Sequence, residues 1–170
     1  MILTSSQKGG LAELKVAAAA ADLGFGILRP MTEGLRYDLV LDVAGSLLRV
    51  QVKWATLKGL VVAIPLRTSR HTPAGYVRTQ YGVEEIEGFA AYCRELDRCL
   101  FLPIAEFVGR TNVHLRLGPA RNGQLRGVKM AAEYPLGAVA QLGERRAGSA
   151  KVRGSSPLSS TARVGPKTRS

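Results

Sequence analysis

The sequence predicts one α/β (α+β) domain, in which a helix is followed by a mixed β-sheet meander with flanking helices. Two observations carry this prediction. Strong helix formers fill the first segment, residues 6–23, and short strand-like segments separated by turn residues follow it. A length of 170 residues suits a single core of ordinary domain size.

The first helix is predicted over residues 6–23. Ser5 or Ser6 suits the N-cap position, and Gly24 suits the position where a helix stops. The run of alanines gives the helix a narrow side that can lie close to a sheet. Helical spacing places four apolar residues on one face, which is expected to be the buried one: Leu11, Leu14, Ala18 and Ala21.

Four short strands are predicted after this helix, over residues 26–29, 36–43, 46–54 and 60–66. The third strand alternates cleanly between two sets of side chains. Leu48, Val50 and Val52 face one side, whereas Arg49, Gln51 and Lys53 face the other. Ala44-Gly45 forms a tight connection, so the second and third strands should pair in antiparallel fashion.

The rest of the folded region is expected to mix short elements. Residues 67–83, which contain Pro73 and Gly75, are predicted to form a loop. The remaining predictions are a turn leading into a strand over 84–92, strands over 98–103 and 112–117, a short helix over 104–108 and a loop over 119–126.

Charge and composition point to a polyanionic partner. The net charge is +11, of which residues 137–170 contribute +6. No apolar run approaches the ~18 residues of a membrane helix, so no membrane partner is expected. Cys93 and Cys99 fit neither a zinc pattern nor a disulfide framework, which favours a reduced, cytoplasmic protein.

Residues 137–170 are predicted to be a disordered basic tail, because Gly, Ser, Arg and Pro dominate and no apolar period persists. The genetic code offers a further explanation. Codons available for residues 140–145 can spell the first hairpin arm of a transfer RNA, and those for residues 153–157 can spell the GGTTCGA arm. We therefore predict that residues 137–161 are read-through of a tRNA gene and that the folded domain spans residues 1–136.

Four polar residues form a candidate catalytic group: Glu13, Asp38, Gln51 and Lys53. Antiparallel pairing can bring Asp38 to the face that carries Gln51 and Lys53. Oxygen ligands suit Mg²⁺, and a lysine can activate the attacking water or offset charge on a phosphorane. The alternatives are ordinary ones: a turn acid, solvent-facing strand residues and a surface helix residue.

The order Glu13, Tyr37-Asp38, Gln51-Val52-Lys53 resembles the PD-(D/E)xK nuclease superfamily, and more narrowly its group I intron-type homing endonucleases. The resemblance spans residues 7–135 and includes Leu28-Arg29-Pro30 and Leu102-Pro103-Ile104. It implies a restriction-endonuclease-like core in residues 1–136.

The resemblance also implies a role for each polar residue. Asp38 would be the main metal ligand, joined by the side chain of Gln51 and the backbone carbonyl of Val52. Lys53 would be the catalytic lysine, and Glu13 a supporting acid and metal ligand. The expected cofactor is Mg²⁺, with Mn²⁺ as an alternative. Gln51 replaces the usual carboxylate and removes one negative charge from the metal site.

Double-stranded DNA is the expected partner. The segment between Asp42 and Glu84 contains no acid and many basic and aromatic residues, which suits tracking of phosphates. The predicted DNA-binding residues are Lys8, Arg49, Lys58, Arg67, Arg70, His71, Tyr76 and Arg78. The alternative is a solvated basic loop with ordinary aromatic packing.

The sequence thus predicts a Mg²⁺-dependent DNA endonuclease of homing or mobile-element type. A Holliday-junction resolvase on the same fold and a catalytically inactive DNA-binding module remain as alternatives. Because one chain carries one candidate site and a double-strand break needs two cuts, a homo-oligomer, either a dimer or a larger assembly, is expected.

Overall fold

The computed structural model describes residues 2–72, 75–118 and 127–153. Its first element is α1 (Ser5–Asp22). The N-cap is Thr4, one residue before the predicted position, because Thr4 and Gln7 form a reciprocal capping box. Gly24 ends the helix with a φ of 79°, as its predicted role requires.

The buried face of α1 differs from the predicted one. Ala12, Val16 and Ala20 are fully buried, whereas Leu14 is 65% exposed. Three small residues one turn apart let the helix backbone approach the sheet closely, and this geometry outweighs the burial of the larger leucine. The narrow alanine-rich side therefore does lie against the sheet, but on a different stripe of the helix.

The central sheet is built around β3 (Ser46–Lys58). Its first half pairs antiparallel with β2 (Leu39–Val43), which pairs with β1 (Gly26–Leu28) at the edge. On its other side β3 pairs in parallel with β7 (Gly88–Cys93), which pairs antiparallel with β8 (Arg98–Pro103). Every residue of β7 is buried, as expected for a strand covered on both faces.

The second half of β3 extends four residues beyond the predicted end and enters a second group of strands. Residues 56–58 pair with β4 (Val61–Pro65), which pairs with β9 (Asn112–Arg116), and β9 pairs in parallel with β10 (Lys129–Met130). Short helical turns connect these strands: η1 (Arg94–Leu96), α2 (Ile104–Phe107), η2 (Ala131–Glu133) and η3 (Leu136–Ala138).

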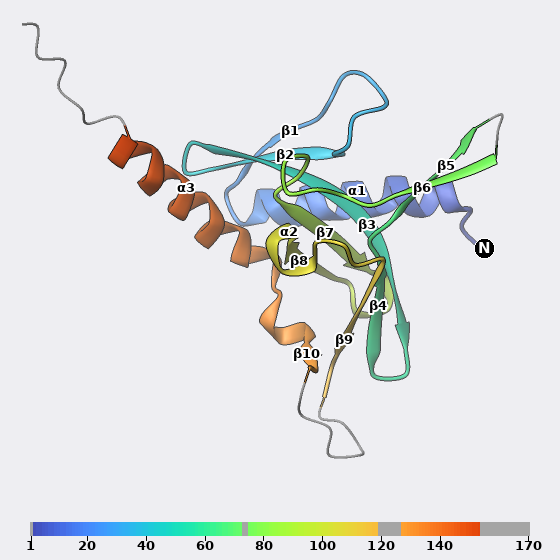
Figure 1. The fold of residues 1–170 in the computed structure, drawn as a ribbon. Helices are drawn as coiled ribbons and strands as arrows, with labels where there is room; N and C mark the ends of the chain where they lie inside the picture. Colours follow the sequence, from blue (N-terminus) through green and yellow to red (C-terminus); the bar gives the residue numbers. More distant parts are fainter. Residues whose placement is uncertain (1, 73–74, 119–126, 154–170) are drawn as a thin grey trace, which may run out of the picture.

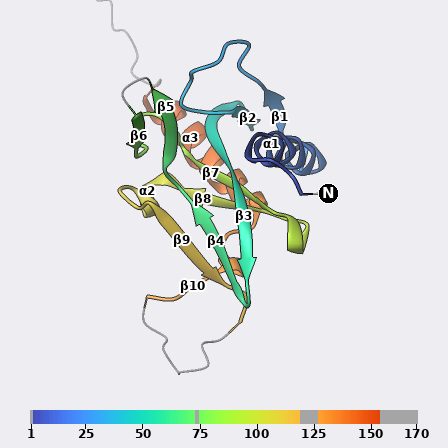
Figure 2. The same cartoon turned by 90° about the vertical axis from the view of Figure 1, so that its right-hand side faces the viewer.

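Two apolar cores lie on opposite faces of the central sheet. Figures 1 and 2 show the backbone around them, with α1 on one side of the sheet. One core joins α1 to the sheet and contains Leu48, Val50 and Val52 from one side of β3. The other contains Ala55 and Phe89 and is closed by β4, β9 and α2. The predicted alternation of β3 is thereby confirmed, because its apolar side faces α1.

Residues 67–83 are predicted by the sequence to be a loop, and the structure shows a hairpin instead. β5 (Thr68–Thr72) and β6 (Gly75–Thr79) pair antiparallel and project from the body of the molecule (Figure 1). Gly75 is the first residue of the returning strand β6, and Pro73 lies outside the described residues. The β-branched residues on either side favour strands.

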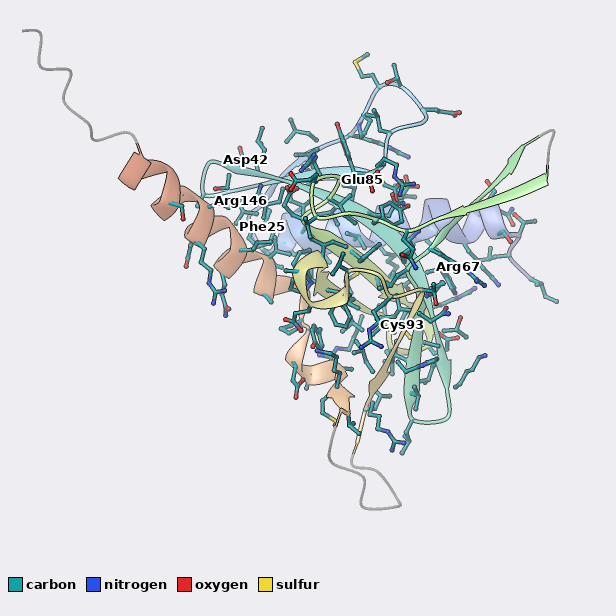
Figure 3. The ribbon with its side chains drawn as sticks, viewed as in Figure 1. Phe25, Asp42, Arg67, Glu85, Cys93 and Arg146 are labelled. Carbon is teal, nitrogen blue, oxygen red and sulfur yellow. The ribbon has the colours of Figure 1, made fainter. Side chains whose placement is uncertain are left out.

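The C-terminal segment also differs from its prediction. Residues 137–153 are expected from the sequence to be disordered and unpacked, but α3 (Val139–Arg153) packs on the sheet. Val139 is fully buried, Ser46 Oγ donates to the Gly143 carbonyl at 2.9 Å, and Arg146 lies 3.0 Å from Glu87 (Figure 3). A few spaced contacts suffice here, although the segment lacks a continuous apolar period.

The predicted boundary after residue 136 therefore does not separate packed from unpacked chain. The remainder of the predicted tail, residues 154–170, lies outside the described residues. None of the helices formed by the described residues combines the length and the apolar character needed to cross a bilayer.

Candidate active site

Asp38 lies immediately before β2, where the β2–β3 pair begins. Its backbone N–H donates to the Val50 carbonyl at 3.0 Å, which continues the ladder by one residue. Its Oδ2 accepts the Val52 N–H at 2.7 Å. The register of the antiparallel pair thus turns the Asp38 carboxylate onto β3 at the position of Gln51 and Val52, as the sequence predicted.

Gln51, in β3, contacts the Asp38 carboxylate through its side chain. Its amide nitrogen donates to Asp38 Oδ2 and lies 3.5 Å from the Val52 carbonyl oxygen. Two oxygens, one anionic and one neutral, therefore point at the same amide hydrogens. An amide oxygen is a neutral donor of the kind that hard cations accept, and rotation of the amide plane would turn the Gln51 oxygen towards the other two oxygens.

Burial by itself raises the pKa of Asp38. The Val52 N–H, the charges of Lys53 and Arg29 and the Gln51 amide oppose this rise, but the pKa of Asp38 stays above its ordinary value. Because burial disfavours the ionised form of Asp38, a positive charge bound close to the carboxylate would stabilise that form.

Lys53 follows two residues after Gln51 on the same face of β3. Burial lowers the pKa of Lys53 to about 8, against the opposing effect of the Asp38 charge, and Arg36 lowers it further. The ammonium group donates to the Arg67 carbonyl at 3.4 Å and lies 5.1 Å from the centre of the Tyr81 ring. Lys53 is therefore a partly buried cation and not a solvent-facing strand residue.

Glu13 reaches the site from α1. Its carboxylate pairs with Arg29 in the loop before β2. Burial raises the pKa of Glu13, as does the charge of Asp38, whereas Arg29 lowers it. The two carboxylates therefore interact electrostatically, and both line one cleft of about 290 Å³. The residues that line this cleft are Glu13, Arg29, Pro30, Met31, Thr32, Glu33, Gly34, Leu35, Tyr37 and Asp38.

The donor set fits a hard divalent cation. Within the described residues, no group of three or more His, Cys, Asp or Glu side chains is arranged to hold a metal. The oxygens that converge are the Asp38 carboxylate, the Val52 carbonyl and, after rotation, the Gln51 amide. Mg²⁺ accepts such a mixed oxygen set and keeps several waters.

The predicted DNA-binding residues do not all gather at this site. Arg49 forms an ion pair with Glu87, whose side chain is only 2% exposed, so its guanidinium group balances a buried charge within the fold. Lys58 lies five residues beyond Lys53, roughly 16 Å away along an extended strand. Lys8 lies in the second turn of α1, and the backbone carbonyl of Arg67 contacts Lys53.

The other four predicted DNA-binding residues belong to the β5–β6 hairpin. Register pairs His71 with Tyr76, and Arg70 and Arg78 lie further from the tip on opposite strands. The side chains of residues 68–79 lie outside the described part of the structure. The hairpin begins directly after Arg67, which is labelled in Figure 3 and whose carbonyl accepts a hydrogen bond from Lys53 Nζ.

Sequence reasoning assigned no site role to three residues that lie here. Arg29 pairs with Glu13, and Arg36 and Lys53 both lie against the Tyr81 ring. Arg29 belongs to the Leu28-Arg29-Pro30 motif, and Tyr81 to the aromatic stretch, but their partners lie 16 and 28 residues away. Only the fold brings these pairs together.

Comparisons with known proteins bear on the same residues. A sequence model of the PD-(D/E)XK endonuclease family matches residues 3–137. The chain resembles the solved structure of a bacterial homing endonuclease, I-Ssp6803I, with a TM-score of 0.70 and 28% identity, over 86% of this chain and 97% of that one. No curated protein matches the chain. The family match and the structural match agree with the resemblance and with the restriction-endonuclease-like core predicted from the sequence.

Proposed function

Because the chain belongs to the PD-(D/E)XK endonuclease family, and is thus a DNA endonuclease, we propose that it is a Mg²⁺-dependent homing endonuclease of a mobile element. The similarity to I-Ssp6803I, a bacterial homing endonuclease, supports this type. Because the site motifs resemble those of group I intron-type homing endonucleases, we also propose that the gene accompanies a group I intron.

One observation carries the proposed chemistry: a carboxylate, an amide and a backbone carbonyl converge from the residue before β2 and from β3, with a partly buried lysine two residues after the amide. Asp38 would hold the cation together with Gln51 and the Val52 carbonyl, and Glu13 would support it across the cleft. When bound, the cation offsets charge on the scissile phosphate and lowers the pKa of its water.

Lys53 would act at the attacking water or at the phosphate. An amine with a pKa of about 8 exchanges its proton near neutral pH, so Lys53 can orient and deprotonate the water or, when charged, offset the phosphorane. The ammonium group of Lys53 donates a hydrogen bond to the Arg67 carbonyl and interacts electrostatically with Asp38. Arg29, held by Glu13, lies where it can meet a phosphate that enters the cleft.

The proposal is tested by a cleavage experiment that selects the target sequence from a mixture. The purified chain is incubated with a plasmid library of fragments from related genomes that lack the mobile element, in Mg²⁺ or in EDTA, and the new ends are sequenced. We expect breaks at one sequence in Mg²⁺ and none in EDTA.

Two other results would contradict the proposal. Preferential cutting of a four-way junction over the linear duplex would indicate a junction resolvase. Specific DNA binding without cleavage in either Mg²⁺ or Mn²⁺ would indicate an inactive binding module.

A further inference from the structure

The two ends of the β5–β6 hairpin are bonded to cationic side chains near the site. Arg67 precedes β5, and its carbonyl accepts a hydrogen bond from Lys53 Nζ at 3.4 Å. Gln80 follows β6, and its carbonyl accepts a hydrogen bond from Arg36 Nη2 at 2.6 Å. The projecting hairpin is therefore joined at its base to the chain segments that carry Asp38 and Lys53.

Tyr81 lies at this base, between the two cations. Its side chain belongs to the second core, and the residue is 6% exposed. The ring centre is 5.1 Å from Lys53 Nζ and 4.1 Å from Arg36 Cζ, and the ring packs edge-to-face on Phe89 at 5.2 Å. Contact with Phe89 fixes the ring, so its π-system is a rigid surface for both cations.

The charge of Arg36 would work against Lys53 if nothing balanced it. Glu85 provides the balance, because its Oε1 lies 2.8 Å from Arg36 Nε and its Oε2 accepts the Gly82 N–H at 2.9 Å. This ion pair also ties the segment after β6 to the residues that precede Asp38. The ring of Tyr81 thus keeps a fixed position relative to both β3 and the loop before β2.

We infer that Tyr81 is a positioning residue for Lys53, and that its ring and the Arg67 carbonyl together hold the ammonium group beside Asp38. This inference rests on the catalytic role proposed for Lys53. A lysine side chain has many rotamers, and without a fixed partner its ammonium group would occupy several positions. Nothing in the family match or the structural match assigns Tyr81 a role.

The experiment compares Tyr81→Phe, Tyr81→Leu and a matched control, Tyr134→Leu. Tyr134 is also 6% exposed and belongs to the same core, and its described contacts are with Phe107, Glu106 and Lys129, away from the site. Single-turnover cleavage is measured at saturating DNA and Mg²⁺, and DNA affinity is measured in Ca²⁺.

We expect Tyr81→Phe, which keeps the ring, to cleave at close to the wild-type rate. Tyr81→Leu should cleave roughly 10- to 100-fold more slowly with unchanged DNA affinity, since a misplaced catalytic group loses that much. Tyr134→Leu should lose similar stability and keep its rate. A wild-type rate in Tyr81→Leu, or an equal loss in Tyr134→Leu, would overturn the inference.

A readout independent of cleavage is the NMR signal of the Lys53 ε-methylene group, assigned with Lys53→Arg. The aromatic ring should displace this signal in the wild type and in Tyr81→Phe, and the displacement should vanish in Tyr81→Leu. Failure to see it would overturn the inference even if the chain proves inactive. Cleavage by Lys53→Ala at the wild-type rate would instead reject the proposed site itself.

Discussion

The Gln51 side-chain amide donates a hydrogen bond to Asp38 Oδ2, the same oxygen that accepts the Val52 N–H. One carboxylate oxygen thus receives two N–H donors from β3. A cation that binds Asp38 meets the amide nitrogen of Gln51 first, and it can gain the amide oxygen only if the side chain turns over. Gln51 therefore competes with the cation in one orientation and can coordinate it in the other.

Gln51→Glu should tighten binding of a divalent cation, because a second carboxylate replaces both the competing donor and the neutral ligand. Electron paramagnetic resonance of Mn²⁺ measures this without DNA, and the Mg²⁺ midpoint of cleavage should fall in parallel. Gln51→Leu, which offers no ligand, should bind Mn²⁺ more weakly than the wild type. Equal midpoints in all three proteins would place Gln51 outside the metal site.

Lys53→Met should stabilise the metal-free protein at neutral pH. Burial lowers the pKa of Lys53 to about 8 from its ordinary value of 10.5. Between these values the folded state binds fewer protons than the unfolded state, so the free energy of unfolding rises with pH in that window. Below pH 8 the full cost of burying the charge remains, and it amounts to no more than about 3 kcal/mol.

The measurement is urea unfolding in EDTA from pH 6 to pH 10.5. Lys53→Met should be more stable than the wild type below pH 8, and the difference should shrink as the pH rises towards 10.5. Lys15→Met is the control, since Lys15 is exposed and pairs with Asp97. A constant difference across the whole range would show that Lys53 is not buried as a cation.

Removal of α3 should destabilise the domain. A chain that ends at Leu136 lacks the fully buried Val139. It also lacks Arg146, so that the buried Glu87 keeps its ion pair with Arg49 and loses the one with Arg146. Burial of a valine contributes roughly 1.5–3 kcal/mol, so the melting temperature should fall by several degrees relative to a chain that ends at Arg153. Equal melting temperatures would support the dispensable tail predicted from the sequence.

The sequence predicted the elements whose signals are local. The β2–β3 pair follows from alternation and from Ala44-Gly45, and this register alone brings Asp38 to Gln51. The helix α3 was not predicted from the sequence, because its Gly- and Arg-rich segment has no continuous apolar period. It packs through spaced contacts, such as those of Val139 and Gly143. Likewise Tyr81 and Lys53 meet only through the folded sheet.

The tRNA-gene origin of residues 137–161 stays a prediction, and it is compatible with a packed helix because a codon constraint does not exclude helical packing. The family match ends at residue 137, where the predicted read-through begins. Sequencing of the flanking DNA decides the point. An intact tRNA gene that overlaps the 3′ end of the reading frame is the expected result, and its absence would leave α3 as an ordinary extension.

The working form should be a dimer or a larger symmetric assembly, because a double-strand break needs two sites on opposite strands. Light scattering coupled to size exclusion, with target DNA bound in Ca²⁺, measures the number of chains per complex. We expect at least two. A monomer that nicks one strand would contradict this prediction and leave the chemistry of the site unaffected.

The central claim is that Asp38 holds the cation that drives DNA hydrolysis. Cleavage of the selected duplex in Mg²⁺ by Asp38→Asn tests it most directly, with Asp42→Asn as the control. Asp42 lies in β2, the strand that follows Asp38, and its Oδ1 accepts the Gly45 N–H at the turn after this strand. We predict that Asp38→Asn loses more than about 100-fold in cleavage rate while it still folds and binds DNA, and that Asp42→Asn cleaves like the wild type. Cleavage by Asp38→Asn at the wild-type rate would contradict the account.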